Sequence, residues 1–194
     1  MSEIKSVILA GVGGQGILLA GNILARAALL AGHDVKTNEV HGMAQRGGSV
    51  VAEIRYGEKV RSPLVEPGTA CALGSLEQME ALRYAHVLAP GALAVVSKTR
   101  IVPTTVSSGA GKYPDDIGDR LGRAFSNLRF IDAAAAAGKA GNPRSNNLVV
   151  LGALSMGLDF PEALWEKAIG ECVKARFVGM NIVAFNLGRE MAEA

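Results

Sequence analysis

A glycine-rich segment directly after a short apolar run is the feature that most constrains how this chain folds. Residues 4–10 are typical of a buried strand and lead into Gly11-Val12-Gly13-Gly14-Gln15-Gly16. Residues 17–31 are rich in Leu and Ala and apolar all round, which predicts a buried helix closed by Gly32. Residues 34–40 indicate a second strand. This order predicts a β–α–β unit whose two strands pair in parallel.

The remaining sequence continues to alternate between strand and helix patterns. Strands are expected at residues 49–56, 59–61 (a hairpin with the preceding strand), 69–73, 92–97, 101–106 (at a sheet edge, because of Pro103) and 128–131. Helices are expected at residues 76–84 with Ser75 as N-cap, at 115–126, after the cap Asp132, at 146–156, from Pro161 onward, and at 177–191. The mixture predicts one α/β domain over residues 1–194: a three-layer α/β/α, Rossmann-like fold with a mainly parallel, mixed sheet.

Composition argues against several kinds of site. The 20 Lys+Arg and 18 Asp+Glu residues give a formal charge of +2, and aromatic residues make up 5%, which disfavours a dedicated nucleic-acid binder. Cys71 and Cys172 are too few to ligate an iron–sulfur cluster, and no zinc-ligand spacing is present, so no metal is expected in this chain. Both cysteines are expected to be small buried apolar side chains. No signal peptide or membrane-spanning stretch is visible, so we expect a cytoplasmic protein without membrane contact.

Gly11, Gly13 and Gly16 fit the G-x-G-x-x-G pattern between a strand and a helix. Such glycines permit a tight turn and leave the N–H groups of the helix N-terminus open to an anion. Glu39 stands at the end of the second strand, where dinucleotide-binding proteins carry an acidic residue. The Gly14-Gln15 pair fits such a ligand poorly. The pattern therefore leaves open both an NAD or FAD site and a strand–helix turn without a ligand.

A second polar loop, His41-Gly42-Met43-Ala44-Gln45-Arg46-Gly47-Gly48, also follows a strand. Ligands of open α/β sheets lie at the carboxyl ends of the strands, so the two loops could line one crevice. Arg46 offers a fork of donors to a carboxylate or phosphate, and His41, a possible catalytic residue, could transfer a proton or only hydrogen-bond. The alternative is a glycine-rich turn against a neighbouring chain, with Arg46 paired to Glu39 or Glu53.

Together the two loops resemble those of the gamma-type domain of the 2-oxoacid:ferredoxin oxidoreductases. The resemblance rests on residues 11–17 and 39–50, extends to residues 146–154 and 177–188, and covers essentially the whole chain. The Met-Ala-Gln-Arg-Gly-Gly segment at 43–48 is similar to that of the small (beta) subunits in the branch of the family that acts on indolepyruvate.

The resemblance implies a subunit of an enzyme that oxidatively decarboxylates arylpyruvates (indolepyruvate, phenylpyruvate) to aryl-acetyl-CoA while reducing ferredoxin. It implies that thiamine diphosphate, magnesium and iron–sulfur clusters reside in a large alpha subunit, and that ferredoxin and coenzyme A act through the complex. The chain itself lacks a cysteine set for clusters and a Gly-Asp-Gly motif for a magnesium-bound diphosphate. It is therefore expected to hold no cofactor and to be inactive alone.

Two interpretations remain for the loops. In one, they cover the thiamine site and contact coenzyme A or the oxoacid carboxylate, with Arg46 as the anion contact and Gln15 and His41 as hydrogen-bonding groups. In the other, they are buried in the subunit interface and touch no ligand. The loop residues concerned are Gly11, Gly13, Gly14, Gln15, Gly16, Glu39, His41, Gln45, Arg46, Gly47 and Gly48. Alternatives for the protein are a gamma subunit for another 2-oxoacid, a stand-alone NAD- or FAD-binding oxidoreductase, and a non-catalytic regulatory or assembly module.

Overall fold

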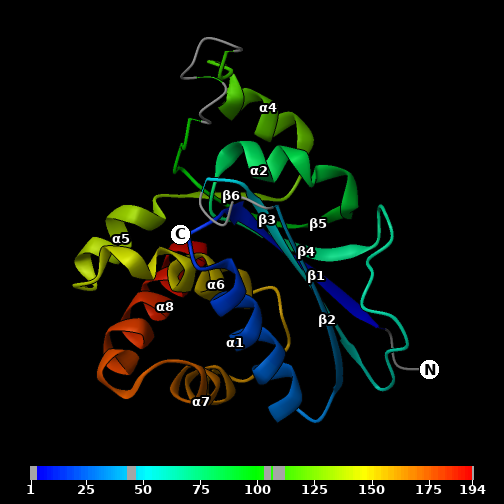
Figure 1. Cartoon of the computed structure of the whole chain (residues 1–194), viewed down its shortest axis with the longest axis vertical. Helices are drawn as coiled ribbons and strands as arrows, with labels where there is room; N and C mark the ends of the chain where they lie inside the picture. The colour runs from blue at the N-terminus through cyan, green and yellow to red at the C-terminus, as the bar shows by residue number, and fades with distance from the viewer. Residues whose placement is uncertain (1–3, 43–46, 103–105, 107–111, 194) are drawn as a thin grey trace.

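The computed structural model describes residues 4–42, 47–102, 106 and 112–193 (Figure 1). The described part is built on a six-stranded sheet. In their order across the sheet the strands are β2 (Asp34–His41), β3 (Ser49–Gly57), β1 (Lys5–Val12), β4 (Ala70–Ser75), β5 (Leu88–Ser97) and β6 (Leu128–Ile131). β1, β4, β5 and β6 pair in parallel, whereas β3 runs antiparallel to both of its neighbours. The predicted mixed, mainly parallel sheet is confirmed.

The N-terminal β–α–β unit has the predicted elements, but the predicted pairing of its strands is wrong. β3 lies between β1 and β2 and pairs with both, so β1 and β2 run in the same direction without being neighbours. β3 suits this inner place because most of its residues are buried. Helix α1 (Ile17–Leu30) lies directly on it: a Cβ on Gly21 would be 3.3 Å from the Ala52 side chain.

Helices cover both faces of the sheet, which confirms the three-layer α/β/α arrangement (Figure 1). One face carries α1, α5 (Ala133–Lys139), α6 (Asn146–Ser155), α7 (Glu162–Cys172) and α8 (Val178–Glu193). The other carries α2 (Gln78–Arg83) and α4 (Ile117–Ala124). Short 3-10 turns lie at η1 (Ala85–Val87), η2 (Pro143–Ser145) and η3 (Ala175–Phe177). Among the described helices, none has the length and apolar character needed to cross a membrane.

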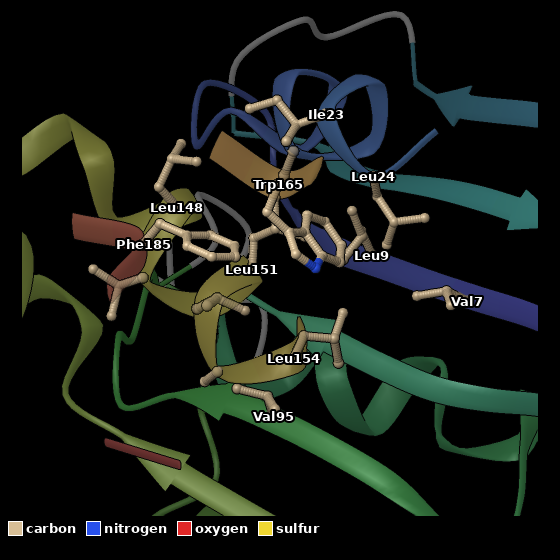
Figure 2. Packing of buried hydrophobic residues seen from close by; sticks show 14 of the residues in the cluster. Val7, Leu9, Ile23, Leu24, Val95, Leu148, Leu151, Leu154, Trp165 and Phe185 are labelled. Carbon is tan, nitrogen blue, oxygen red and sulfur yellow. The ribbon is translucent and has the colours of Figure 1, made fainter. Parts of the chain in front are cut away.

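Helix α6 forms the centre of the larger core, with Trp165 and Phe185 beside its leucines (Figure 2). Two glycines let α8 lie directly on it. A Cβ on Gly152 would be 1.9 Å from the carbonyl oxygen of Phe185, and a Cβ on Gly188 would be 2.0 Å from that of Val149. Because both obstacles are backbone atoms, these positions accept only glycine at the observed helix separation.

Two predicted strands are wrong. Residues 59–61 do not return along the sheet; the Val60 N–H donates to Oδ2 of Asp34 at 2.8 Å, and its side chain is buried, so burial replaces strand pairing. Ile101 and Val102 lie outside any strand, and residues 103–105 lie outside the described part. β6 instead forms that edge of the sheet.

One of two predicted helix caps is confirmed. Asp132 caps α5, where its carboxyl group accepts a hydrogen bond from the Ala135 N–H at 3.0 Å. Ser75 is instead the last residue of β4, and the cap of α2 is Glu77. A glutamate can take this place because its longer side chain folds back onto the first-turn N–H groups of Met79 and Glu80, at 2.6 and 3.0 Å.

Candidate functional site

The glycine loop, residues 11–16, connects β1 to α1 at the edge of the sheet where the parallel strands end. Gly16 has a φ of 83°, in the left-handed region that favours glycine. A Cβ at Gly16 would lie 2.6 Å from Nδ2 of Asn147, and one at Gly11 would lie 2.8 Å from Oε1 of Gln15. The loop therefore needs glycine both for its turn and for the close approach of these two side chains.

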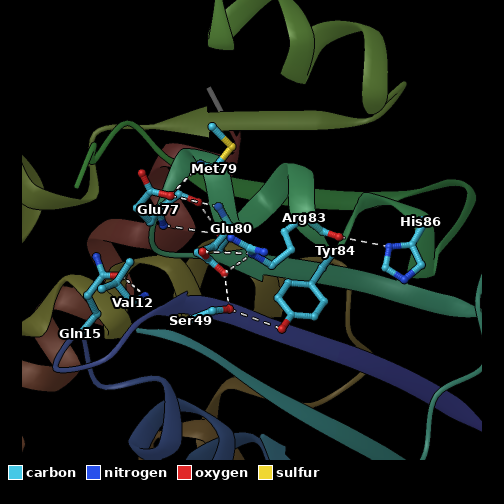
Figure 3. Close-up of polar contacts among 10 residues, drawn as sticks. Val12, Gln15, Ser49, Glu77, Met79, Glu80, Arg83, Tyr84 and His86 are labelled. Carbon is cyan, nitrogen blue, oxygen red and sulfur yellow. Dashed lines mark hydrogen bonds and ion pairs between the residues drawn. The ribbon is translucent and has the colours of Figure 1, made fainter. Parts of the chain in front are cut away.

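The Gln15 side chain stabilises the glycine loop through two hydrogen bonds to backbone atoms. Its Oε1 accepts a hydrogen bond from the Val12 N–H at 2.7 Å, and its Nε2 donates to the carbonyl oxygen of Leu76 at 2.9 Å (Figure 3). These bonds tie the glycine loop to the connection between β4 and α2. Because both ends of its amide are used in these bonds, Gln15 is first a structural residue and only secondarily a candidate contact.

The second loop, residues 41–48, lies beside the glycine loop. The Gly13 N–H donates to Gly48 O at 2.8 Å, and the Gly47 N–H donates to Gly13 O at 3.4 Å. Gln45 and Arg46 lie outside the described residues. His41 is exposed, with its Nδ1 lying 3.4 Å from Gly42 O. The structure thus brings the described parts of both predicted loops together at one edge.

The acidic residues considered as partners of Arg46 lie on neighbouring strands. Glu39 is exposed on β2, and Glu53 of β3 accepts a hydrogen bond from Nδ2 of Asn38 at 3.0 Å. In dinucleotide-binding folds the acidic residue stands on the strand adjacent to β1. Here β3 intervenes and moves Glu39 one strand farther from the glycine loop. This displacement disfavours the NAD or FAD alternative.

The first turn of α2 anchors the loops at this edge (Figure 3). Glu80 accepts a hydrogen bond from Ser49 Oγ, which fixes the end of the second loop. Glu77 is 1% exposed, and its Oε1 accepts from the Ile101 N–H at 3.2 Å and from the Tyr113 hydroxyl at 2.6 Å. Burial of Tyr113, together with this bond, raises the pKa of its hydroxyl.

A third segment, residues 98–113, therefore reaches the same edge, where its described ends are held. Gln78 Nε2 donates to Lys98 O at 2.6 Å, close to the bonds from Glu77. Sequence reasoning missed this segment because residues 101–106 have the apolar pattern of a strand. The segment could have been found from its place after β5, because β1 and β5 run in the same direction and their carboxyl ends lie at one edge of the sheet.

Two hollows flank the glycine loop. The apolar pocket has a volume of about 460 Å³ and is lined by Val12, Gly13, Gly14, Gly16, Ile17, Leu18, His41 and Val50. The polar pocket has a volume of about 500 Å³ and lies toward α6, α7 and α8. Its lining residues are Gly14, Gln15, Gly16, Leu19, Asn142, Arg144, Ser145, Asn147, Cys172, Val173, Lys174, Phe177 and Asn181.

Residues 6–191 match the family model described as pyruvate ferredoxin/flavodoxin oxidoreductase. The chain belongs to this family. Indolepyruvate oxidoreductase subunit IorB of Archaeoglobus fulgidus is 40% identical to it over 191 residues, which cover 96% of this chain and 94% of IorB. The predicted family, and the prediction of an oxidoreductase subunit, are confirmed.

Two further similar proteins extend the comparison. Ketoisovalerate oxidoreductase subunit VorA of Methanothermobacter thermautotrophicus is 31% identical, and the match covers 96% of this chain but 36% of VorA. The crystal structure of the gamma subunit of a keto/oxoacid ferredoxin oxidoreductase from Geobacter sulfurreducens has a TM-score of 0.72 and 25% identity. That match covers 97% of this chain and 98% of the Geobacter chain.

The described part of this family member offers no set of side chains for a metal. No group of three or more His, Cys, Asp and Glu residues there could hold an ion. Cys71 and Cys172 are half-buried, rather than fully buried as expected, and contact the larger core. Burial raises the pKa of the Cys172 thiol.

Proposed function

We propose that this chain is the small subunit of an indolepyruvate:ferredoxin oxidoreductase that converts arylpyruvates to aryl-acetyl-CoA and reduces ferredoxin. The observation that carries the proposal is the 40% identity with IorB over nearly the full length of both chains. Phenylpyruvate belongs to the same proposed substrate class, because its side chain is also an aromatic ring on a pyruvate. A cytoplasmic location is part of the proposal.

The partner in this proposal is a large alpha subunit. In VorA the region similar to this chain is 36% of a longer polypeptide, so there the same domain is joined covalently to further chain. A separate chain of this type needs an equivalent partner. The loop edge is the surface we assign to it, because the apolar pocket lies there and its lining residue Leu18 is 38% exposed.

Thiamine diphosphate, magnesium and the iron–sulfur clusters are assigned to the alpha subunit. The donor set of this chain does not fit them: it has two cysteines, where an iron–sulfur cluster takes four ligands. When bound in the partner, thiamine diphosphate supplies carbanion stabilisation for decarboxylation, and the clusters carry electrons to ferredoxin. Ferredoxin and coenzyme A therefore meet this chain through the complex.

Within that complex the loops of this chain border the thiamine site. Arg46 is the proposed contact for a carboxylate or a coenzyme A phosphate, since its guanidinium binds both in a fixed fork. His41 lines the apolar pocket and is the proposed hydrogen-bond or proton-transfer group toward the substrate. The bonds from Gly13 to the second loop, and from Ser49 to Glu80, hold these loops against the sheet.

Co-production with the alpha subunit tests the proposed complex. We expect the two chains to purify together, with thiamine diphosphate and iron in the complex and with neither in this chain alone. Co-purification with a partner that lacks thiamine diphosphate would instead favour an assembly module. A yellow isolated chain, or one that binds NADH tightly, would favour the stand-alone oxidoreductase.

An Arg46→Ala complex separates a ligand contact from a purely structural loop. Loss of a charge-assisted contact of about 1.5–3 kcal/mol is expected to raise the KM for coenzyme A or the oxoacid at least tenfold. Arg61→Ala, an exposed arginine distant from the loops in sequence, is the matched control and is expected to leave both KM values unchanged. Unchanged constants in an intact Arg46→Ala complex would assign the loops to the interface alone.

A further inference from the structure

Strand β2 forms one edge of the sheet, and none of its eight residues is buried. All eight pair with β3 in one continuous antiparallel register without a bulge. On its other side, β2 has no neighbouring strand among the described residues, so every second residue of this regular strand directs its N–H and C=O groups outward. The strand is therefore long and regular enough to pair with a further strand.

The helical layers leave β2 largely uncovered on both faces of the sheet. On the face that carries α1, Thr37 is exposed, whereas Ile54, opposite it on β3, is buried. On the other face Val40 is 53% exposed, whereas Val51, opposite it on β3, is 4% exposed. The buried layers thus end at β3, and a strand beside β2 would find room.

β2 also lacks the features that keep most edge strands unpaired, which are proline, a bulge, short length or an outward lysine. β6, the opposite edge of the sheet, is four residues long and exposes Arg129. β2 has no proline and no bulge, and Nζ of its single lysine, Lys36, lies 3.0 Å from Oδ1 of Asp34 on the same strand. This contrast indicates that β2 has a partner in the assembled protein.

The side chains of β2 are complementary to a second copy of the same strand. Two copies related by a two-fold axis pair antiparallel, and one residue lies opposite itself at the axis. An axis at Lys36 or at Glu39 would oppose like charges, which destabilises a pair of strands. An axis at Thr37 would set the Glu39 carboxylate against Val35. An axis at Asn38 opposes two neutral amides instead.

The register centred on Asn38 is also complementary on both sides of the axis. Thr37 lies opposite Glu39 of the second copy, where its hydroxyl can donate to the carboxylate. Lys36 lies opposite Val40 of the second copy, so its apolar stem covers the most exposed apolar side chain of the strand. Each of these pairs occurs twice, because the axis repeats it.

We infer that β2 is an interface between two copies of this chain, which pair antiparallel across a two-fold axis at Asn38. The two six-stranded sheets become one continuous sheet. The inference goes beyond the proposed function and does not depend on it, because it uses only the strand edge. The loop edge lies at the carboxyl ends of the parallel strands and stays available to the alpha subunit.

Disulfide trapping of the full-length chain tests the register. Asn38→Cys places two thiols at the axis, where the Cβ atoms of opposed residues lie about 4.5–5.5 Å apart. Lys36→Cys is the matched control: it lies on the same face of β2, but in this register its two copies are offset by roughly 13 Å along the strands, beyond the reach of a disulfide.

Mild oxidation is expected to convert several times more of the Asn38→Cys chain to a covalent dimer than of Lys36→Cys. The wild type, with its half-buried Cys71 and Cys172, gives the background. Equal dimer fractions in the two variants and the wild type would overturn the inference.

Sedimentation equilibrium of Asn38→Lys tests the interface without a cross-link. A lysine at this position can still bond Glu53, which accepts from Asn38 at 3.0 Å, but it sets two ammonium groups opposite each other at the axis. We expect the dissociation constant of the dimer to rise about fivefold. Asn127→Lys makes the same substitution beside β6 and is expected to leave the constant unchanged. A monomeric wild type, or an unchanged constant in Asn38→Lys, would overturn the inference.

Disulfide trapping in the complex distinguishes a second copy from the alpha subunit as the occupant of β2. A disulfide between two Asn38→Cys chains supports the inference, whereas a disulfide to the alpha subunit in its place would overturn it. A complex that forms the β2 dimer and oxidises no arylpyruvate would overturn the proposed function while supporting this interface.

Discussion

Replacing Gly188 with alanine tests one of the closest backbone contacts in the fold. A Cβ at this position of α8 would lie 2.0 Å from Val149 O and 3.0 Å from the backbone nitrogen of Ala153, both on α6. Because these atoms are backbone, no side chain can rotate away. The two helices must separate by more than about 1 Å to restore an ordinary contact distance.

The expected cost of the Gly188→Ala change follows from two opposing effects. Overpacking of a well-packed core costs up to about 3 kcal/mol, and the backbone obstacle places this site at the upper end. Alanine gains about 1 kcal/mol over glycine in a helix interior. We therefore expect the free energy of unfolding to fall by about 2 kcal/mol.

Urea unfolding measures this loss directly, because the single tryptophan, Trp165, is buried in the affected core. Gly179→Ala is the matched control, since Gly179 is an exposed position of the same helix where an added Cβ would meet nothing within 4 Å. That variant is expected to be as stable as the wild type or up to about 1 kcal/mol more stable. Equal stability of the two variants would refute the steric reasoning.

Three further changes test the loop anchors and one cap. Tyr113→Phe removes the bond to Glu77 and is expected to cost about 1 kcal/mol at neutral pH. Because the pKa of Tyr113 is raised in the folded state, the neutral hydroxyl stabilises the fold below its ordinary pKa of 10.0, and this stabilisation is lost as the pH rises above that value. Raising the pH should therefore lower the free energy of unfolding of the wild type more than that of Tyr113→Phe. Gln15→Leu leaves the Val12 N–H without its acceptor and is expected to lower the free energy of unfolding by about 1–3 kcal/mol and to speed amide hydrogen exchange in the glycine loop. Stability and exchange rates equal to those of the wild type would contradict the structural role of Gln15. Asp132→Ala is expected to cost about 1 kcal/mol in thermal unfolding, with recovery in Asp132→Asn.

Local sequence patterns predicted where the helices and strands lie along the chain better than they predicted which strands pair with one another. The strand at residues 128–131 and the start of the helix at residue 146 agree with β6 and α6. The place of β3 between β1 and β2 could not be predicted, because strand order depends on which faces are buried and not on the order along the chain. The strand predicted at residues 59–61 is wrong for a related reason: the Val60 N–H donates to Asp34, and the Val60 side chain is buried, without pairing to a neighbouring strand.

The same division applies to the candidate site. The glycine loop and the second loop could be located because glycine-rich turns after strands have a sequence signature. The roles of Glu77 and Asn147 had no such signature. Glu77 contacts Ile101, and Asn147 contacts Gly16 from 131 residues away, so only the tertiary fold assigns them.

The rate of ferredoxin reduction by the purified two-chain complex tests the proposed enzyme most directly. The assay compares indolepyruvate and phenylpyruvate with pyruvate and ketoisovalerate, with and without coenzyme A. We expect rapid, coenzyme A-dependent reduction with the two arylpyruvates, and none when this chain or the alpha subunit is tested alone. Preference for pyruvate or ketoisovalerate, or full activity of the alpha subunit without this chain, would contradict the proposed function.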